Sequence, residues 1–327
     1  MRIASLLPSA TEIVCALGME DELVAVTHEC DYPESVRAKP VLTRSVLSQD
    51  GSSVEVDRHI RELVHQGSSI YALDGARLAA VQPDLILTQE LCEVCAVSYP
   101  IVERAARRLG SSPQLVSLEP ESLGDVFENI LFVGGLVGRP DTAREICNEL
   151  RRRVASVEQR VAGKPRRRVV CLEWVDPPYN CGHWTPGLVA MAGGEDLLGV
   201  AGQPAHPVEW QQVIDLQPEV VVVMACGFSL DRSLRETETV RGRFDALRAD
   251  LWVVDGNAFF SRPGPRLVDS VEIMAGILHP GVMDAPSPTA ARRFGAAATR
   301  PARSERPRPL PGSAAPRRRA SGSARRA

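Results

Sequence analysis

The chain has 327 residues, of which 44% are hydrophobic and 24% are charged, and its formal net charge is -3 at pH 7. This length is enough for two lobes of ordinary domain size, each with its own core. Apolar runs such as residues 219–225 are far shorter than the roughly 20 residues that span a bilayer, which excludes a transmembrane helix. The first residues lack the apolar core and cleavage site of a signal peptide, so we expect a cytoplasmic location.

The charge is unevenly distributed along the chain. From residue 285 to the C-terminus there are eleven Arg and one Glu, so this end carries +10 and residues 1–284 carry -13. An acidic body argues against nucleic-acid binding by the folded part, because phosphate contacts need a basic surface. Residues 283–327 are rich in Pro, Ala, Ser and Arg, and we predict a disordered tail whose partner is unknown.

Seven short aliphatic or β-branched runs predict strands. Most of them are followed by a loop and then by a helical pattern, which is typical of βα units and a mostly parallel sheet. In the first unit, Ser9 is the expected helix N-cap, with Glu12 three residues on and Gly18 closing the helix. The seven runs are residues 3–6, 23–26, 85–88, 114–117, 169–172, 220–224 and 251–254.

No strand pattern occurs between residues 121 and 163. Apolar residues recur there at helical spacing, and the sequence GRPD at residues 138–141 marks a new helix start. That helix, from Thr142 to Gly163, would be about 33 Å long at 1.5 Å per residue and could bridge two lobes. We therefore predict an N-terminal α/β lobe at 1–139, a linker helix at 140–164 and a C-terminal α/β lobe at 165–282.

Five segments place Cys, His, Glu or aromatic residues directly after strand-like runs. Ligands bind outside the carboxyl ends of strands in open α/β sheets, so these segments predict one shared cleft. Aromatic rings would offer flat surfaces, carboxylates would accept hydrogen bonds, and histidines would be axial ligands to a chelated metal. The residues expected to contact ligand are His28, Glu29, Cys30, Tyr32, Glu90, Glu173, Trp174, Tyr179, His183, Trp184, Phe259, Phe260 and Arg262.

Each of these roles has an open alternative. Aromatic residues often belong to the core, loop carboxylates are often solvated, and cleft histidines often only pack against ligand. Arg262 is expected to face anionic ligand groups, whereas Arg266 is expected to be a helix-surface charge.

The eight cysteines are expected to be reduced, given the absence of an export signal. Cys92 and Cys95 form a C-x-x-C pair at a strand-to-helix junction, where thiols bind soft metals or cycle as a dithiol. Cys30 and Cys181 would complete a thiolate site for Zn or Fe. Alternatively, these cysteines line an organic-ligand pocket without bonding. Cys171 is expected to lie in the core.

Six short motifs, in order over residues 1–280, carry a family resemblance. They are RIASLLPSATEI at 2–13, CDYP at 30–33, VQPDLI at 81–86, DPPY at 176–179, AGGED at 192–196 and FSRPGPRL at 260–267. Their order and spacing resemble those of the helix-linked, class III substrate-binding proteins for vitamin B12 and iron-siderophores. The resemblance implies two βα-sandwich lobes with mostly parallel sheets, a single linking helix and a chelate ligand held between the lobes.

The resemblance also implies delivery of ligand to an ABC importer, through an acidic residue on each lobe. Ala76 and Gln211 stand at those positions here, with Asp74 and Glu209 nearby. We therefore expect a monomeric cytoplasmic protein that binds cobalamin, a related corrinoid or another metal chelate, without an importer. It is not expected to be an enzyme, since it has no Walker, G-x-G-x-x-G or G-x-S-x-G motif.

Two alternatives stay open. The first is a thiolate metal-binding or redox protein on the same fold. The second is the substrate-binding component of an ABC importer for cobalamin or iron-siderophore, with a missed export signal.

Overall fold

The computed structural model describes residues 1–47, 51–65, 68–90, 97–110 and 112–295. Residues Met1–Phe294 form one compact unit. We predicted that the tail begins at residue 283, and this start is too early. β12 (Ala291–Arg293) still belongs to the fold, because it pairs antiparallel with β11 (Asp250–Val254). The buried residues Ala290 and Ala291 hold this segment on the sheet. The predicted disorder of residues 296–327 lies outside the described residues.

The first sheet has four parallel strands in the order β2-β1-β5-β6, and all four were predicted. Alternate residues face opposite sides: Ile3 packs with α1 and α5, and Ala4 with α3 and α4. Helices therefore cover both faces, which is why these strands read as near-continuous apolar runs. The bounds are β1 (Ile3–Ser5), β2 (Leu23–Ala25), β5 (Leu85–Thr88), β6 (Gln114–Ser117), α1 (Pro8–Ala16), α3 (Gly75–Val81), α4 (Tyr99–Ala106) and α5 (Leu123–Leu136).

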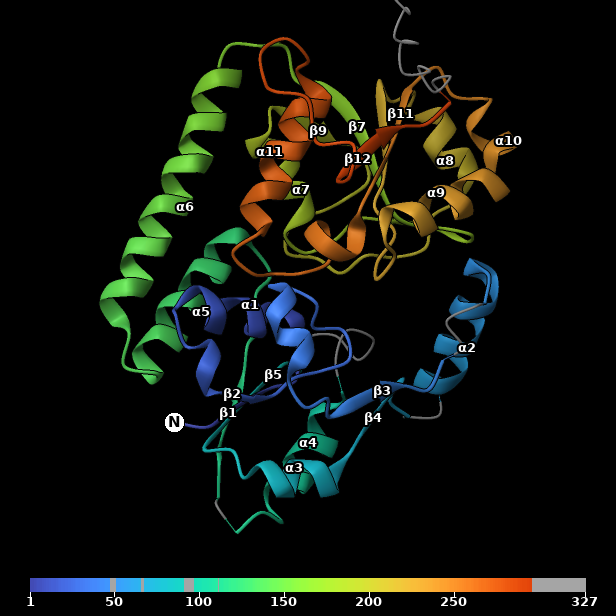
Figure 1. Cartoon of the computed structure of the whole chain (residues 1–327). Coiled ribbons are helices and arrows are strands. Elements are labelled where there is room, and N and C mark those ends of the chain that lie inside the picture. Colours follow the sequence, from blue (N-terminus) through green and yellow to red (C-terminus); the bar gives the residue numbers. More distant parts are fainter. Residues whose placement is uncertain (48–50, 66–67, 91–96, 111, 296–327) are drawn as a thin grey trace, which may run out of the picture. The chain divides into compact units, whose positions relative to one another are not determined.

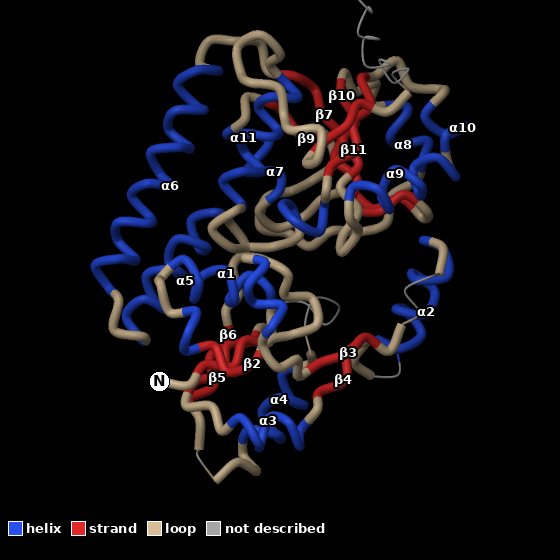
Figure 2. Tube along the Cα trace, in the orientation of Figure 1, coloured by secondary structure: helices blue, strands red, loops and turns tan. Residues whose placement is uncertain are grey.

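The second sheet runs in the order β12-β11-β10-β7-β8, and β9 also pairs with β7. Val169 and Val220 face the side of α7 and α11, and Val170 and Val221 face the side of α8 and α9 (Figure 2). β8 and β12 are antiparallel to their neighbours, so the sheet is mixed at both edges. The bounds are β7 (Arg167–Val175), β8 (Pro178–Asn180), β9 (Gly194–Asp196), β10 (Val220–Val223), α7 (Thr185–Met191), α8 (Trp210–Asp215), α9 (Leu230–Thr239), α10 (Arg241–Phe244) and α11 (Leu267–Leu278).

The predicted linker helix is present as α6 (Pro140–Val161), which begins two residues earlier than expected. Pro140 stands in its first turn, where the missing N–H costs nothing. The helix packs against α5 of the first lobe and α11 of the second (Figure 1). Its buried stripe recurs at helical spacing and consists of Ala143, Cys147, Leu150, Val154, Val157 and Val161. In the following text the N-lobe comprises β1 to α5 and the C-lobe β7 to β12.

A hairpin and a helix were not predicted. β3 (Thr43–Ser45) and β4 (Tyr71–Leu73) pair antiparallel, and α2 (Ser53–His65) lies between them in the sequence. β3 reads TRS and β4 reads YAL, so neither lies in an aliphatic run like those that marked β1 and β2. Short helical turns at Glu20–Glu22, Glu34–Ala38 and Gly256–Phe260 complete the described elements. No helix in the described ranges is long and apolar enough to cross a membrane.

Candidate functional site

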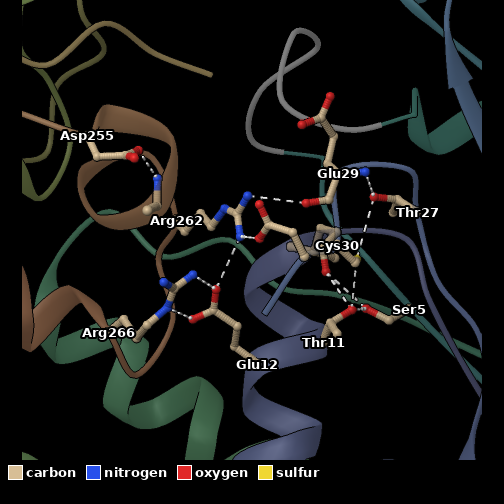
Figure 3. Close-up of polar contacts among 12 residues, drawn as sticks. Ser5, Thr11, Glu12, Thr27, Glu29, Cys30, Asp255, Arg262 and Arg266 are labelled. Atoms are coloured by element: carbon tan, nitrogen blue, oxygen red, sulfur yellow. Dashed lines mark hydrogen bonds and ion pairs between the residues drawn. The ribbon is translucent and has the colours of Figure 1, made fainter. Parts of the chain in front are cut away.

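Glu12 is a buried ion-pair acceptor and not the capping residue that was predicted. α1 begins at Pro8 with Leu7 as its N-cap, because proline is favoured in the first turn, so Ser9 lies inside the helix. The side chain of Glu12 is only 2% exposed. Its two oxygens accept hydrogen bonds from Arg266, with Nη2–Oε1 at 2.6 Å and Nε–Oε2 at 3.0 Å. This is a bidentate pair between α1 and the residues that precede α11 (Figure 3).

Arg262 joins the same network. It is 3% exposed, pairs with Asp31 and lies 3.5 Å from Glu12, and its Nη2 donates to the carbonyl oxygen of Glu29 at 3.2 Å. The expectation that Arg262 faces anionic ligand groups is wrong in this structure, because protein carboxylates already neutralise its charge. We call Glu12, Asp31, Arg262 and Arg266 the inter-lobe ion cluster.

Arg266 was predicted to be a surface charge, and this too is wrong. Its guanidinium carbon lies 4.0 Å from the ring centre of Tyr32 and 5.6 Å from that of Phe259. Cation–π contact of this kind favours a desolvated guanidinium. Tyr32 and Phe259 were predicted to contact ligand. In this structure their rings contact Arg266 of the inter-lobe ion cluster.

Cys30 is a hydrogen-bonded thiol of the N-lobe. Its Sγ lies 3.0 Å from Thr11 Oγ1 and 3.5 Å from Thr27 Oγ1, and Thr11 also donates to Ser5 at 2.8 Å. Burial raises the pKa of Cys30, an effect that the threonine hydrogen bonds partly offset. Among the described residues, Cys30 belongs to no group of three side chains that could hold a metal ion together.

His28 and Glu29 lie at a small hollow at the carboxyl end of the N-lobe sheet. His28 Nδ1 is 2.7 Å from Thr43 Oγ1, its Nε2 is 3.2 Å from a Glu29 oxygen, and its ring centre is 5.3 Å from that of Tyr71. Glu90 is exposed and lies two residues after the end of β5. Cys92 and Cys95 lie outside the described residues. The lining residues of the hollow are Leu6, Pro8, Thr27, His28, Glu29, Thr43, Tyr71 and Val97.

Trp174 and Tyr179 of the C-lobe contact α2 of the N-lobe. Tyr179 donates its hydroxyl hydrogen to Asp57 at 3.0 Å and accepts from Arg61 at 3.0 Å. Trp174 Nε1 donates to the carbonyl oxygen of Ser53 at 3.3 Å. Ser53 N also donates to Glu236 of α9 at 3.1 Å. A helix missed in the sequence therefore holds two of the predicted aromatic residues.

Phe260 packs in the core, and Trp184 packs against it. Phe260 is 3% exposed within the main hydrophobic cluster, and Trp184 Nε1 donates to its carbonyl oxygen at 2.8 Å. Phe260 is therefore a core residue and not the cleft residue that was predicted, whereas Trp184 is half-buried against the same cluster and its place in a cleft stays a prediction. His183 stacks on Trp184 with ring centres 5.7 Å apart, and burial lowers its pKa. Its Nδ1 is buried, and the described residues offer it no hydrogen-bond partner.

Cys181 does not lie with Cys30, contrary to prediction. It is fully buried in the C-lobe beside Cys171, and its thiol donates to Asp196 at 3.2 Å. Glu173 accepts from Gly182 N at 2.9 Å, but desolvation and the neighbouring Cys226 raise its pKa to about 8. Cys30 and Cys181 were predicted to face one cleft from opposite lobes, and among the described residues they form no common site.

The residues missed by sequence reasoning share one property, which is that their partners are distant in sequence. Arg266 is 254 positions from Glu12, and Tyr179 is 122 from Asp57. A signal was present, since Glu12 and the two arginines lie inside the motifs LLPSATE and FSRPGPR that carry the family resemblance. The sequence did not show which of these acidic and basic side chains form ion pairs with one another.

The comparisons with known proteins agree with this architecture. Residues 3–248, more than half of the chain, match the family model described as periplasmic binding protein. A vitamin B12-binding protein of Vibrio cholerae is 24% identical over 274 residues, 83% of this chain and 86% of that protein. One of Yersinia pestis is 25% identical over 239 residues, 70% of this chain and 71% of that protein.

Two solved structures share the fold. The periplasmic vitamin B12 binding protein of Vibrio cholerae superposes with a TM-score of 0.63 at 21% identity, covering 85% of this chain and 96% of that one. A periplasmic heme binding protein from Pseudomonas aeruginosa superposes with a TM-score of 0.68 at 19% identity, covering 90% and 99%. The two-lobe α/β fold predicted from the sequence is confirmed. The chain belongs to the periplasmic binding protein family.

Proposed function

We propose that this protein binds a metal chelate, cobalamin or a related corrinoid first, where the carboxyl ends of its two sheets meet, and presents it to an ABC importer. One observation carries the proposal: polar and aromatic side chains of both lobes converge there. Glu12 and Asp31 face Arg262 and Arg266, and Tyr179 faces α2. Heme and iron-siderophores are the other members of the ligand class. Binding alone accounts for this arrangement, and no catalytic step is proposed.

Ligand titration tests the proposal. The full chain is titrated with cyanocobalamin, hemin and a ferric hydroxamate, followed by calorimetry and visible absorption. We expect saturable binding of cobalamin and a loss of at least about tenfold in affinity for Trp174→Ala, because a buried aromatic anchor dominates such contacts. The matched control is Trp210→Ala, since Trp210 lies in α8 against Phe244. Equal losses in both folded variants, or saturation by none of the three chelates, would contradict the proposal.

His183 is the better candidate of the two predicted axial ligands. His28 Nδ1 lies 2.7 Å from Thr43 Oγ1, and its Nε2, which has no hydrogen-bond partner, lies 3.2 Å from a Glu29 oxygen, whereas Nδ1 of His183 has neither kind of contact among the described residues. An imidazole nitrogen without a protein partner is free to reach cobalt or iron. Aquocobalamin titrated into the His183→Ala variant should therefore lose an imidazole-type spectral change that the His28→Ala variant keeps.

The importer partner is supported by the family and contrasts with our sequence-based expectation of a cytoplasmic receptor without an importer. No observation on this chain supports that receptor. Asp74 caps α3 and Glu209 caps α8, and both are exposed, one on each lobe. They are suitably charged to meet arginines of an importer.

Docking can be measured with the importer reconstituted in nanodiscs. We expect the double variant Asp74→Lys and Glu209→Lys to weaken docking at least about tenfold, because like charges now oppose each other across the interface. Cobalamin affinity should be unchanged, which separates docking from ligand binding. Undiminished docking by the double variant, or a purely cytoplasmic location in fractionated cells, would count against the importer.

A further inference from the structure

Two buried thiols and one carboxylate converge in the C-lobe, away from the residues assigned to the chelate. β7 and β8 are antiparallel with Leu172 opposite Asn180, so Cys171 and Cys181, the next residues out, face each other. Both thiols are fully buried. β9 pairs with the first half of β7 and ends at Asp196. One ligand atom from each of Cys171, Cys181 and Asp196 lies within 4.8 Å of the other two.

The Asp196 carboxylate is held in place by backbone amides. Its Oδ1 accepts hydrogen bonds from Leu198 N at 2.9 Å and from Gly199 N, while Oδ2 accepts from the Cys181 thiol at 3.2 Å. A Cβ at Gly199 would lie 2.6 Å from the Cys181 sulfur, so the close approach of this loop requires glycine. Outer-shell hydrogen bonds of this kind orient metal ligands in known sites.

The surroundings of the three residues are acidic. Glu173, two residues from Cys171, accepts a hydrogen bond from the backbone amide of Gly182, the residue after Cys181. Within the described parts of the chain, Asp196 and Glu173 take part in no ion pair with Arg, Lys or His. The half-buried Asp196 carboxylate therefore has no protein cation beside it, and a bound cation would neutralise it.

We propose that Cys171, Cys181 and Asp196 form a binding site for a thiophilic divalent cation of the zinc class. The two Sγ atoms and Oδ2 would supply three of four tetrahedral ligands, leaving one position for water or an exchangeable group. Both thiols lose their protons to solvent on binding, so that M²⁺ is held by two thiolates and one carboxylate. The site replaces the four-cysteine set expected from the sequence, retaining only Cys181. Since the thiols are fully buried, the ion enters as the chain folds.

Refolding with Co²⁺ as the probe tests the site. The full chain is reduced, unfolded and refolded anaerobically with Co²⁺, and thiolate-to-cobalt absorption is recorded before and after addition of Zn²⁺. We expect one equivalent of tetrahedral Co²⁺ that Zn²⁺ displaces. The signal should persist in Cys92→Ser/Cys95→Ser, which removes the C-x-x-C pair, and in Cys147→Ser, which removes another fully buried thiol.

Cys171→Ser and Cys181→Ser should lose the signal, and Asp196→Asn, which keeps both thiols, should weaken Co²⁺ binding at least about tenfold. Far-ultraviolet circular dichroism shows whether each serine variant folds. If one does not, Asp196→Asn still tests the site, because it keeps both thiols. The proposal is overturned if no thiolate absorption appears, or if the absorption disappears in Cys92→Ser/Cys95→Ser. Retention at full affinity in folded Asp196→Asn excludes the carboxylate as a ligand and also overturns it.

Discussion

Replacing Glu12 by Gln is expected to lower the free energy of unfolding by about 3–5 kcal/mol, since removing one partner leaves buried charges uncompensated. Glu12 is the bidentate acceptor of Arg266, whose side chain is 14% exposed, and it also lies beside Arg262, which is 4% exposed. Gln keeps the size of the side chain and removes only the charge. Asp31 still faces Arg262 in the variant, but Arg266 loses its partner carboxylate.

Urea unfolding followed by circular dichroism measures this effect. The matched control is Asp141→Asn, which removes the carboxylate of an ion pair with Arg144 on the surface of α6, where Asp141 is 86% exposed. Exposed pairs contribute roughly 0–1 kcal/mol, so the control should unfold almost as the parent does. A loss below about 1 kcal/mol for Glu12→Gln would show that the inter-lobe ion cluster contributes no more than a surface pair.

Replacing Gly256 by Ala is expected to destabilise the protein by about 1–3 kcal/mol, because overpacking a filled site forces the backbone to shift. A Cβ at this position would lie 2.3 Å from the carbonyl oxygen of Ala225 and 2.8 Å from that of Met224. Neither is the flexible end of a side chain that could move aside. Gly256 begins the turn that leads to Arg262, so the same shift would disturb the inter-lobe ion cluster.

Gly242→Ala is the matched control for this substitution. Gly242 lies in α10, and no atom lies within 4 Å of the position that its Cβ would take. Gly-to-Ala replacement at such a site commonly raises stability by about 0.4–1 kcal/mol. The urea concentrations at the unfolding midpoints of the two variants test both predictions together. If the midpoint of Gly256→Ala equals or exceeds that of Gly242→Ala, the close approach of Gly256 to the residues after β10 does not destabilise the variant.

The strands and the linker helix could be predicted because their signals are local. The Val220–Val223 run of β10 is apolar at every position, since helices cover both faces of the sheet. The stripe of α6 repeats at helical spacing over its whole length. Three-residue strands such as β3 and β8 gave no comparable pattern, so the hairpin and the mixed sheet edges were not predicted.

The sequence predicted which loops gather at the carboxyl ends of the sheets, but not which of their residues pair with one another. Residues after β2, β7 and β8 do collect at the carboxyl ends of the sheets, as the topology rule requires. However, Arg262 and Arg266 neutralise Glu12 and Asp31, Phe260 enters the core, and Cys181 joins Cys171 and Asp196. None of these partners could be chosen from residue type alone.

The amino-acid sequence by itself determined the βα alternation, the long helix α6 and the family, because periodicity, capping and short motifs act over a few neighbouring residues. Only the tertiary structure decided the partners of the buried charges and thiols. Glu12 and Arg266 are 254 positions apart, and their meeting depends on how both lobes pack against α6. Contacts across such separations are set by the packing of whole elements, which no local pattern of residues encodes.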